Sequence, residues 1–228
     1  MNYKFGIAIP WREQPSRVYA FNAIINHYKR EFVDVPIYYG DFPSERWNTS
    51  GSRNIACEKA FADGCDVVAV MDADFFMHPQ AIKEGVEKAV KLGRMVIPFQ
   101  NLYFLDQVFS QKLVEGELGL NKIGLYFPVY RHQVAGSNII TKEVFETLNG
   151  WDERFLGWGY EDVAFTMAHE TLIGPVSKIN NYAASLFHED RDKELVDNNK
   201  EHAELYASYV DDPSLMKDLI AGNRLNVS

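Results

Sequence analysis

Acidic and aromatic side chains crowd into the segment Asn149–Asp162, which reads NGWDERFLGWGYED. Glycines on both sides of Trp158 permit a tight turn that exposes the indole, because glycine adopts backbone angles that other residues resist. Glu161 and Asp162 would then lie in the first turn of a new helix, where exposed N–H groups and the dipole stabilise carboxylates. An aromatic plate beside a fixed carboxylate can hold a sugar and remove a proton from its hydroxyl. The structural alternative is a loop of core aromatics that ends in an acidic pair.

Two further carboxylates, Asp72 and Asp74, follow the continuous apolar run Val67–Met71. Such a run is typical of a strand that is buried on both faces. Two hard oxygen donors at a strand end suit Mg²⁺ or Mn²⁺, which in turn bridge phosphates. The alternative is a solvated strand end at which Asp74 helps to cap the next helix.

One of the six histidines, His188, ends an apolar stretch in the second half of the chain. As a third ligand facing Asp74, it would complete a carboxylate–imidazole site that suits Mn²⁺. A purely structural histidine is the alternative. His169 is the competing ligand, but we expect it in the middle of a helix.

Cationic and polar residues follow the other expected strands or open a helix: Pro10, Trp11, Arg12, Asp41, Arg53 and Asn54. Arg12 can make a forked contact to phosphate. Arg53 lies at a helix start, where backbone N–H groups favour anions. The alternative for both arginines is a surface position without a ligand. Asp41 can accept a hydrogen bond from a base or ribose, or it is a plain turn acid. None of these stretches resembles a phosphate loop or a dinucleotide glycine fingerprint, which disfavours a P-loop ATPase or a dehydrogenase.

The first half, which must position these residues, alternates short apolar strands with amphipathic helices. The expected strands are Phe5–Pro10, Val35–Tyr39, Val67–Met71 and Met95–Phe99. The expected helices are Arg17–Glu31, Ser52–Asp63 with Ser50 or Ser52 as its cap, and Pro79–Leu92 with Gly93 as its stop. This order predicts an α/β fold with a mostly parallel sheet flanked by helices. Ligands of such sheets bind outside the carboxyl ends of the strands.

The second half has a different pattern. Gln100–Val134 is aromatic-rich connecting structure with a possible helix over Leu102–Glu115. Further expected elements are a strand over Gly136–Ile140 that leads into a Thr141-capped helix, short strands at Val176–Ile179 and Ala184–His188, an amphipathic helix in the tail Asp192–Ser228, and a last helix from Pro213. We expect the tail to cover the domain and assign no chemistry to it.

Length and charge restrict the class of protein. The 228 residues, 46 % of them hydrophobic, suffice for one domain with a substantial core. The net charge of −9 disfavours nucleic acid or an anionic membrane as the main partner. Cys57 and Cys65 have neither metal-site nor redox spacing, so we expect buried thiols in a reducing compartment. Neither a signal peptide nor a membrane-spanning apolar run is visible.

Taken in order, these motifs resemble a GT-A fold glycosyltransferase. The second half is most similar to the C-terminal region of the β-1,4-galactosyltransferase family and to related family 2 and polypeptide N-acetylgalactosaminyltransferase-like enzymes. The motifs that carry the resemblance are Trp-Gly-x-Glu-Asp at 158–162, Asn-Gly-Trp at 149–151, Pro-aromatic-Arg at 10–12, Arg-Asn at 53–54, Asp-x-Asp at 72–74, and His188. Val163 stands where the galactosyltransferases have a further acid. Ser185 stands where they have a methionine metal ligand.

The resemblance implies a metal-dependent hexosyltransferase that moves a sugar from a nucleotide-diphosphate donor, a UDP-sugar, to an acceptor hydroxyl with inversion. It implies Mn²⁺ or Mg²⁺ as cofactor, held by Asp72, Asp74 and His188. Asp162 would be the general base, and Glu161 would grip a sugar. The implied donor-binding residues are Pro10, Trp11, Arg12, Asp41, Arg53, Asn54 and Asp72. The implied acceptor-binding residues are Trp158, Gly159 and Tyr160.

The resemblance also implies one domain over 1–228. Its nucleotide-binding half would span 1–99, its acceptor-binding and catalytic half 100–190, and its C-terminal helical cover 191–228. Without a stem or membrane anchor, the chain resembles a cytoplasmic bacterial or phage enzyme. The acceptor stays open among a glycan, a protein and a modified base, and retention stays open beside inversion. The alternative functions are a nucleotidyltransferase and a non-catalytic nucleotide-sugar-binding module.

Overall fold

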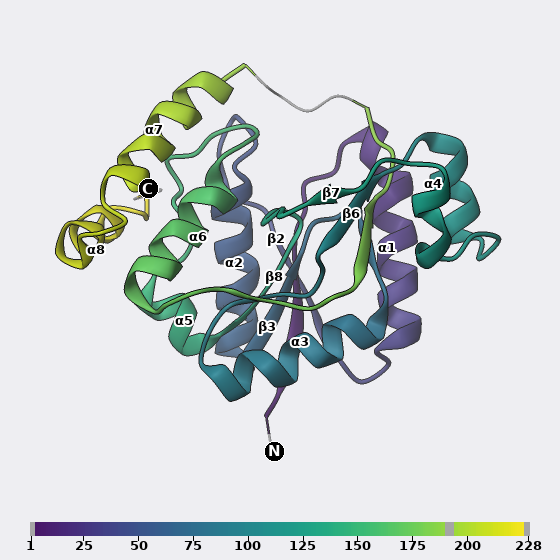
Figure 1. Cartoon of the computed structure of the whole chain (residues 1–228), viewed down its shortest axis with the longest axis horizontal. Coiled ribbons are helices and arrows are strands. Elements are labelled where there is room, and N and C mark those ends of the chain that lie inside the picture. The colour runs from purple at the N-terminus through teal and green to yellow at the C-terminus, as the bar shows by residue number, and fades with distance from the viewer. Residues whose placement is uncertain (1–2, 190–193, 226–228) are drawn as a thin grey trace.

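A six-stranded sheet lies at the centre of the fold, in the order β2-β1-β3-β8-β5-β9 (Figure 1). The structure is a computed structural model, and it describes residues 3–189 and 194–225. The strands of this sheet are β1 (Phe5–Pro10), β2 (Ile37–Gly40), β3 (Val67–Met71), β5 (Val96–Ile97), β8 (Ser137–Thr141) and β9 (Ser177–Lys178).

The sheet is mostly parallel, as the sequence predicts, with one strand reversed. β1 pairs in parallel with β2 and β3, and β5 pairs in parallel with β9. β8 lies antiparallel between β3 and β5. Consecutive strands of the first half are therefore not all neighbours, because a strand from the second half is inserted next to β3. This insertion brings Asn138 of β8 opposite Val70, close to the end of the strand that precedes the paired aspartates.

Helices cover both faces of the sheet because side chains of successive strand residues point to opposite faces. On one face, Val67, Ala69 and Met71 pack with α1 (Val18–Glu31) and α3 (Pro79–Leu92). On the other face, Val68 and Val70 pack in a second core cluster. That second cluster includes residues of α2 (Thr49–Ala62), α5 (Lys142–Thr147) and α6 (Glu161–Leu172), and of the two C-terminal helices. α2 and α6 lie side by side in Figure 1, so residues about 110 positions apart can meet at their N-termini.

The start of α2 differs from the prediction. The helix begins at Thr49, and its cap is Asn48, whose side-chain oxygen accepts a hydrogen bond of 2.8 Å from Gly51 N. The predicted cap at Ser50 or Ser52 is wrong because both serines lie inside the helix. Ser52 Oγ instead accepts the backbone N–H of Phe42 at 3.1 Å.

A second sheet, in the order β4-β10-β6-β7, stands beside the first. Its strands are β4 (Phe75–Met77), β6 (Asn101–Phe104), β7 (Tyr130–Arg131) and β10 (Tyr182–Ser185). The helix predicted over Leu102–Glu115 is wrong in its first part. Residues 101–104 pair in parallel with β10, so a distant strand decides their conformation. The actual helix is α4 (Gln107–Val114), which is capped by Asp106.

The remaining elements are the 3-10 turns η1 (Pro15–Arg17) and η2 (Leu120–Leu125) and the C-terminal helices α7 (Val196–Ser208) and α8 (Pro213–Ala221). α7 and α8 pack on the outer side of α6 (Figure 1). The ends of the predicted tail, residues 192–193 and 226–228, lie outside the described residues, as does Asp190. Within 3–189 and 194–225, no helix is both long and apolar enough to span a bilayer.

Candidate active site

A cavity of about 450 Å³ opens where β1 and β3 end, between the second sheet and the start of α6. Both halves of the chain line it. The lining residues that the sequence singled out are Pro10, Trp11, Arg12, Asp72, Asp74, Trp158, Gly159, Tyr160, Glu161, Asp162 and His188. The cavity thus lies at the carboxyl ends of the strands, as expected for a mostly parallel sheet.

Arg53 joins the acidic residues of the two halves. Its side chain is only 2 % exposed. One guanidinium nitrogen, Nη1, lies 2.8 Å from Asp162 Oδ1 and 3.4 Å from Glu161 Oε1. The other, Nη2, lies 2.8 Å from Asp72 Oδ1. Because a buried guanidinium needs paired charges around it, this arrangement fixes the acids of α6 against the end of β3.

Asp162 is a buried carboxylate whose pKa is raised well above its ordinary value. Burial is the main cause, and the negative charges of Glu161 and Asp72 add to it, against the opposing charge of Arg53. The Nδ2 of Asn138 donates a hydrogen bond of 3.4 Å to Asp162 Oδ1. A carboxylate with a raised pKa is a stronger base, so Asp162 has the chemistry of a proton acceptor.

The segment before α6 places Trp158 at the rim of the cavity, where the side chain stays 39 % exposed. Gly157 anchors the turn, since its N–H donates to Trp47 O at 3.0 Å. Tyr160 adopts a left-handed backbone conformation with φ of +71°, which is rare for a bulky residue. Such strain is characteristic of functional segments that surrounding structure holds in place.

Asp74 and His188 lie next to each other in the lining of the same cavity. Asp74 Oδ2 lies 3.5 Å from His188 Nε2 and accepts a hydrogen bond of 2.6 Å from Ser185 Oγ. Burial alone would raise the pKa of Asp74, but the hydrogen bonds from His188 and Ser185 outweigh it and keep the pKa below its ordinary value. Ser185 therefore bonds directly to a predicted metal ligand.

Asp72 lines the same cavity as Asp74 and His188 but bonds to Arg53. Across the described ranges, no three or more His, Cys, Asp or Glu side chains are already gathered closely enough to hold a metal ion. Asp74 and His188 thus form a pair, and Asp72 stands on the Arg53 side of the cavity. The three-ligand metal site stays a prediction.

Arg12 is held by acceptors of the protein itself. Nε donates to Asp41 Oδ1 at 2.7 Å, Nη1 donates to Ser44 O at 2.9 Å, and Nη2 donates to Phe42 O. Its guanidinium also lies over the Trp47 ring, 5.6 Å from the centroid. Asp41 is not among the lining residues, and its contact is to Arg12 rather than to the cavity.

Asn54 points away from the cavity into the loop that precedes α6. Its Oδ1 accepts the Trp151 N–H at 2.8 Å, and its Nδ2 donates to Trp151 O and to Glu153 Oε1, both at 2.9 Å. Asn54 is fully buried. The structure therefore brings it to the loop that precedes α6, whereas the sequence placed it with the nucleotide.

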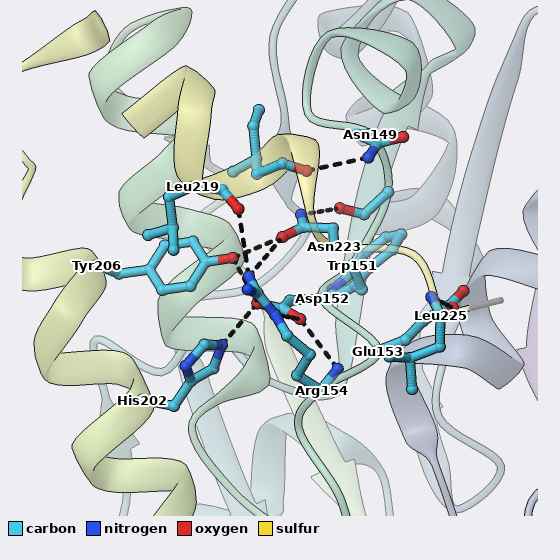
Figure 2. A network of polar contacts seen from close by, with 12 residues as sticks. Asn149, Trp151, Asp152, Glu153, Arg154, His202, Tyr206, Leu219, Asn223 and Leu225 are labelled. Carbon is cyan, nitrogen blue, oxygen red and sulfur yellow. Dashed lines mark hydrogen bonds and ion pairs between the residues drawn. The ribbon is translucent and has the colours of Figure 1, made fainter. Parts of the chain in front are cut away.

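The C-terminal tail takes part in a polar network that the sequence reasoning missed (Figure 2). Asp152 is bonded to the Arg154 guanidinium at 2.7 and 2.8 Å and to His202 Nε2 and Tyr206 Oη, both at 2.8 Å. Tyr206 Oη also lies 2.9 Å from Asn223 Oδ1. The acidic and basic residues of the Trp-Asp-Glu-Arg run were a signal for buried pairing, although their partners could not be read from the sequence.

A mostly parallel sheet with paired aspartates at a strand end, facing an acidic helix start, is the arrangement expected of a GT-A fold. Residues 117–169 match a family model described as the N-terminal domain of galactosyltransferase. This stretch contains the Trp-Gly-x-Glu-Asp motif. No curated protein sequence matches the chain.

Solved glycosyltransferases share the fold. The catalytic domain of Drosophila β-1,4-galactosyltransferase 7 in complex with xylobiose aligns with a TM-score of 0.55 and 16 % identity, over 89 % of this chain and 80 % of that one. A mutant of that enzyme with manganese, UDP-Gal and xylobiose aligns with a TM-score of 0.51 and 17 % identity, over 78 % of this chain and 65 % of that one. Staphylococcus aureus TarS aligns with a TM-score of 0.55 and 11 % identity, over 96 % and 70 %. The expected resemblance to GT-A glycosyltransferases is confirmed.

Proposed function

We propose that this protein is a metal-dependent glycosyltransferase that moves a sugar from a UDP-sugar to an acceptor hydroxyl, with inversion at the anomeric carbon. The observation that carries the proposal is the grip of Arg53 on both Asp72 and Asp162. It supports a single reaction centre in which strand-end carboxylates and a buried base meet the same substrate. The complexes of the similar Drosophila enzyme with manganese and UDP-Gal add support.

The donor would lie at the ends of β1 and β3, where Pro10, Trp11 and Arg12 line the cavity. Trp11 is held rigidly by stacking on Phe21, with ring centroids 3.9 Å apart. Asp41 acts here by fixing Arg12, since the two form an ion pair of 2.7 Å. These residues shape the wall against which the nucleotide would bind.

The chemistry of the donor set fits Mn²⁺ or Mg²⁺. Asp74, whose pKa is lowered, supplies an ionised carboxylate, His188 supplies an imidazole, and Asp72 lies on the same cavity. When bound, the ion supplies positive charge that offsets the charge developing on the leaving diphosphate. Arg53 holds Asp72 in place for this role.

A carboxylate oxygen of Asp162 would take the proton of the acceptor hydroxyl. The hydroxyl oxygen would then bond to the anomeric carbon as the bond from that carbon to the diphosphate breaks. Burial and the raised pKa suit Asp162 to the proton transfer. Trp158, with its exposed indole, would stack on a sugar ring, and Glu161 would hold a sugar hydroxyl. Gly159 and Tyr160 would set the angle at which these groups enter the cavity.

Transfer and hydrolysis of UDP-sugars, measured with Mn²⁺ and with EDTA, test the proposal. We expect turnover that requires the metal, that is lost in Asp74→Ala, and that falls about a hundredfold or more in Asp162→Asn with near-normal donor binding. Asp218→Asn, the same chemical change on an exposed carboxylate of α8, is the matched control. Nucleotide binding without turnover would instead indicate a binding module, and pyrophosphate release from a nucleoside triphosphate would indicate a nucleotidyltransferase. Unchanged transfer in Asp162→Asn would remove this residue from the base role.

The proposal extends to organisation and location. Residues 1–99 would bind the nucleotide, 100–190 would bind the acceptor and catalyse transfer, and 191–228 would form the cover. The buried free thiols of Cys57 and Cys65 favour a reducing compartment, so we retain a cytoplasmic enzyme of bacterial or phage origin as part of the hypothesis. The acceptor remains a glycan, a protein or a modified base.

A further inference from the structure

The cavity carries more negative than positive charge. Four carboxylates line it, those of Asp72, Asp74, Glu161 and Asp162, within a chain of net charge −9. A diphosphate entering this cavity needs cationic donors, because its negative oxygens would otherwise meet carboxylates of the same sign. The question is which side chain supplies the positive charge.

The two arginines singled out from the sequence are already engaged. All three guanidinium nitrogens of Arg12 donate to acceptors in the connection between β2 and α2. Both terminal nitrogens of Arg53 donate to carboxylates, and its side chain is almost fully buried. Arg12 is thus a fixed part of the cavity wall, whereas Arg53 is not among the lining residues.

Arg17, at the end of η1, is different. It lines the cavity beside Asp74, and its Nε is buried without a hydrogen-bond partner among the described residues. The backbone N–H of Arg17 donates to Gln14 O at 2.9 Å, which fixes the residue at the end of the turn that Pro15 opens. A buried guanidinium N–H that lacks an acceptor is unfavourable, so a position that retains one is suited to an incoming acceptor.

The neighbourhood of Arg17 indicates where this acceptor would lie. Its positive charge acts on Asp74, which pairs with His188. The diphosphate of the donor is expected on this side of the cavity, whereas the acceptor sugar is expected near Trp158. A guanidinium presents two parallel donors that match a phosphate group, which an ammonium group cannot reproduce.

We propose that Arg17 binds the diphosphate of the nucleotide-sugar donor, with its guanidinium as the cation that the protein leaves open for phosphate oxygens. The inference rests on the proposed glycosyltransferase function and assigns a residue to its donor site. In this arrangement, Arg12 shapes the cavity wall against which the nucleotide binds, and Arg17 contacts the diphosphate.

Calorimetric titration of the full chain with UDP and with uridine, each with and without Mn²⁺, tests the inference in Arg17→Gln and Arg17→Lys. We expect Arg17→Gln to raise the Kd for UDP at least tenfold under both conditions and to leave uridine binding unchanged. Arg17→Lys should lie between Arg17→Gln and the wild type, because it keeps the charge but loses the fork. Arg30→Gln, which removes an exposed arginine of α1 outside the cavity, controls for the change in net charge.

The outcomes separate this inference from the proposed function. A wild-type chain that binds no UDP even with Mn²⁺ contradicts the glycosyltransferase function itself. A wild-type chain that binds UDP, together with an Arg17→Gln variant whose Kd is within twofold, overturns only the role of Arg17. A loss of uridine binding as large as the loss of UDP binding also overturns the role of Arg17. Weaker binding of the acceptor at an unchanged affinity for UDP overturns it as well. Thermal unfolding of each variant verifies that the chain is folded.

Discussion

Replacing Asp152 by asparagine should remove the charge at the centre of the tail network while keeping the shape of the side chain. Asp152 is 2 % exposed and receives hydrogen bonds from Arg154, His202 and Tyr206. Burial would raise its pKa, but these partners lower it from 3.8 to about 2. Because each unit by which the pKa is lowered corresponds to about 1.4 kcal/mol, the ionised carboxylate contributes about 2 kcal/mol to the free energy of unfolding at pH 7.

The sign of the pH dependence follows from the lowered pKa. The stabilisation is complete above the unfolded pKa of 3.8 and is lost as the pH falls through the folded pKa of about 2. We therefore expect Asp152→Asn to unfold with about 2 kcal/mol less free energy at pH 7. About half of this difference should have disappeared by pH 3, because the wild-type carboxylate then takes up its proton on unfolding.

Urea unfolding at several pH values between 7 and 3, followed by tryptophan fluorescence, measures this difference. Asp218→Asn is the matched control and should stay within about 0.5 kcal/mol of the wild type, as is usual for exposed positions. A difference for Asp152→Asn that is absent at pH 7, or that stays constant down to pH 3, would refute the reasoning. The first result would mean that the network carries no net free energy, and the second that the charge of Asp152 is not its source.

Two further predictions concern stability. Met95 N donates to the fully buried His169 Nε2 at 2.9 Å, and burial lowers the pKa of His169 to about 4 from 6.5. The fold therefore favours the neutral imidazole, and its stabilisation is fully present above pH 6.5. Between pH 6.5 and 4, the free energy of unfolding in urea titrations should fall by about 3 kcal/mol more for the wild type than for His169→Gln. Parallel pH profiles of the two proteins would contradict this. A Cβ on Gly40 would lie 1.9 Å from the backbone oxygen of Ser52, so Gly40→Ala should cost about 3 kcal/mol or more. In Gly119→Ala the new Cβ meets only a flexible side chain, and if both variants melted alike the proposed backbone clash would be wrong.

Local signals sufficed for the elements that begin and end with clear chemistry. The strands Phe5–Pro10 and Val67–Met71 were predicted to the residue, and α3 starts at Pro79 and ends before Gly93 as expected. Thr141 caps α5 through a hydrogen bond from Val144 N. In each case, the determining residues lie within a few positions of the boundary that they set.

Elements that depend on distant partners were not predicted. The stretch Asn101–Phe104 carries apolar residues that fit a helix or a strand, and only its parallel pairing with β10 decides for the strand. The insertion of β8 between β3 and β5 likewise depends on contacts that no local pattern records. Sequence reasoning therefore predicted a strand over Gly136–Ile140 but not its position beside β3, which brings Asn138 to the candidate site.

The residues of the candidate site also divide into those that local patterns predicted and those that depend on distant or loop contacts. The rule that ligands bind beyond the carboxyl ends of parallel strands brought Asp72 and Asp74 to the cavity, and the acidic helix start brought Asp162. Arg12 is engaged by Asp41 and by two backbone carbonyls, whereas the Nε of Arg17 has no partner among the described residues. Both results depend on how a loop and a 3-10 turn fold. Residue type alone could not distinguish these two arginines.

Two adjacent residues of α2 show how the geometry of the candidate site depends on packing away from the cavity. Arg53 holds Asp162, 109 positions away, and Asn54 clamps the backbone of Trp151, 97 positions away. Both contacts are buried, so the start of α6 and the loop before it are positioned by a single helical turn. A small tilt of α2 would move the candidate base and the aromatic rim together. The tail network around Asp152 holds the same loop from its other side, which gives the C-terminal helices a role in positioning the site although none of their residues except Val196 lines the cavity.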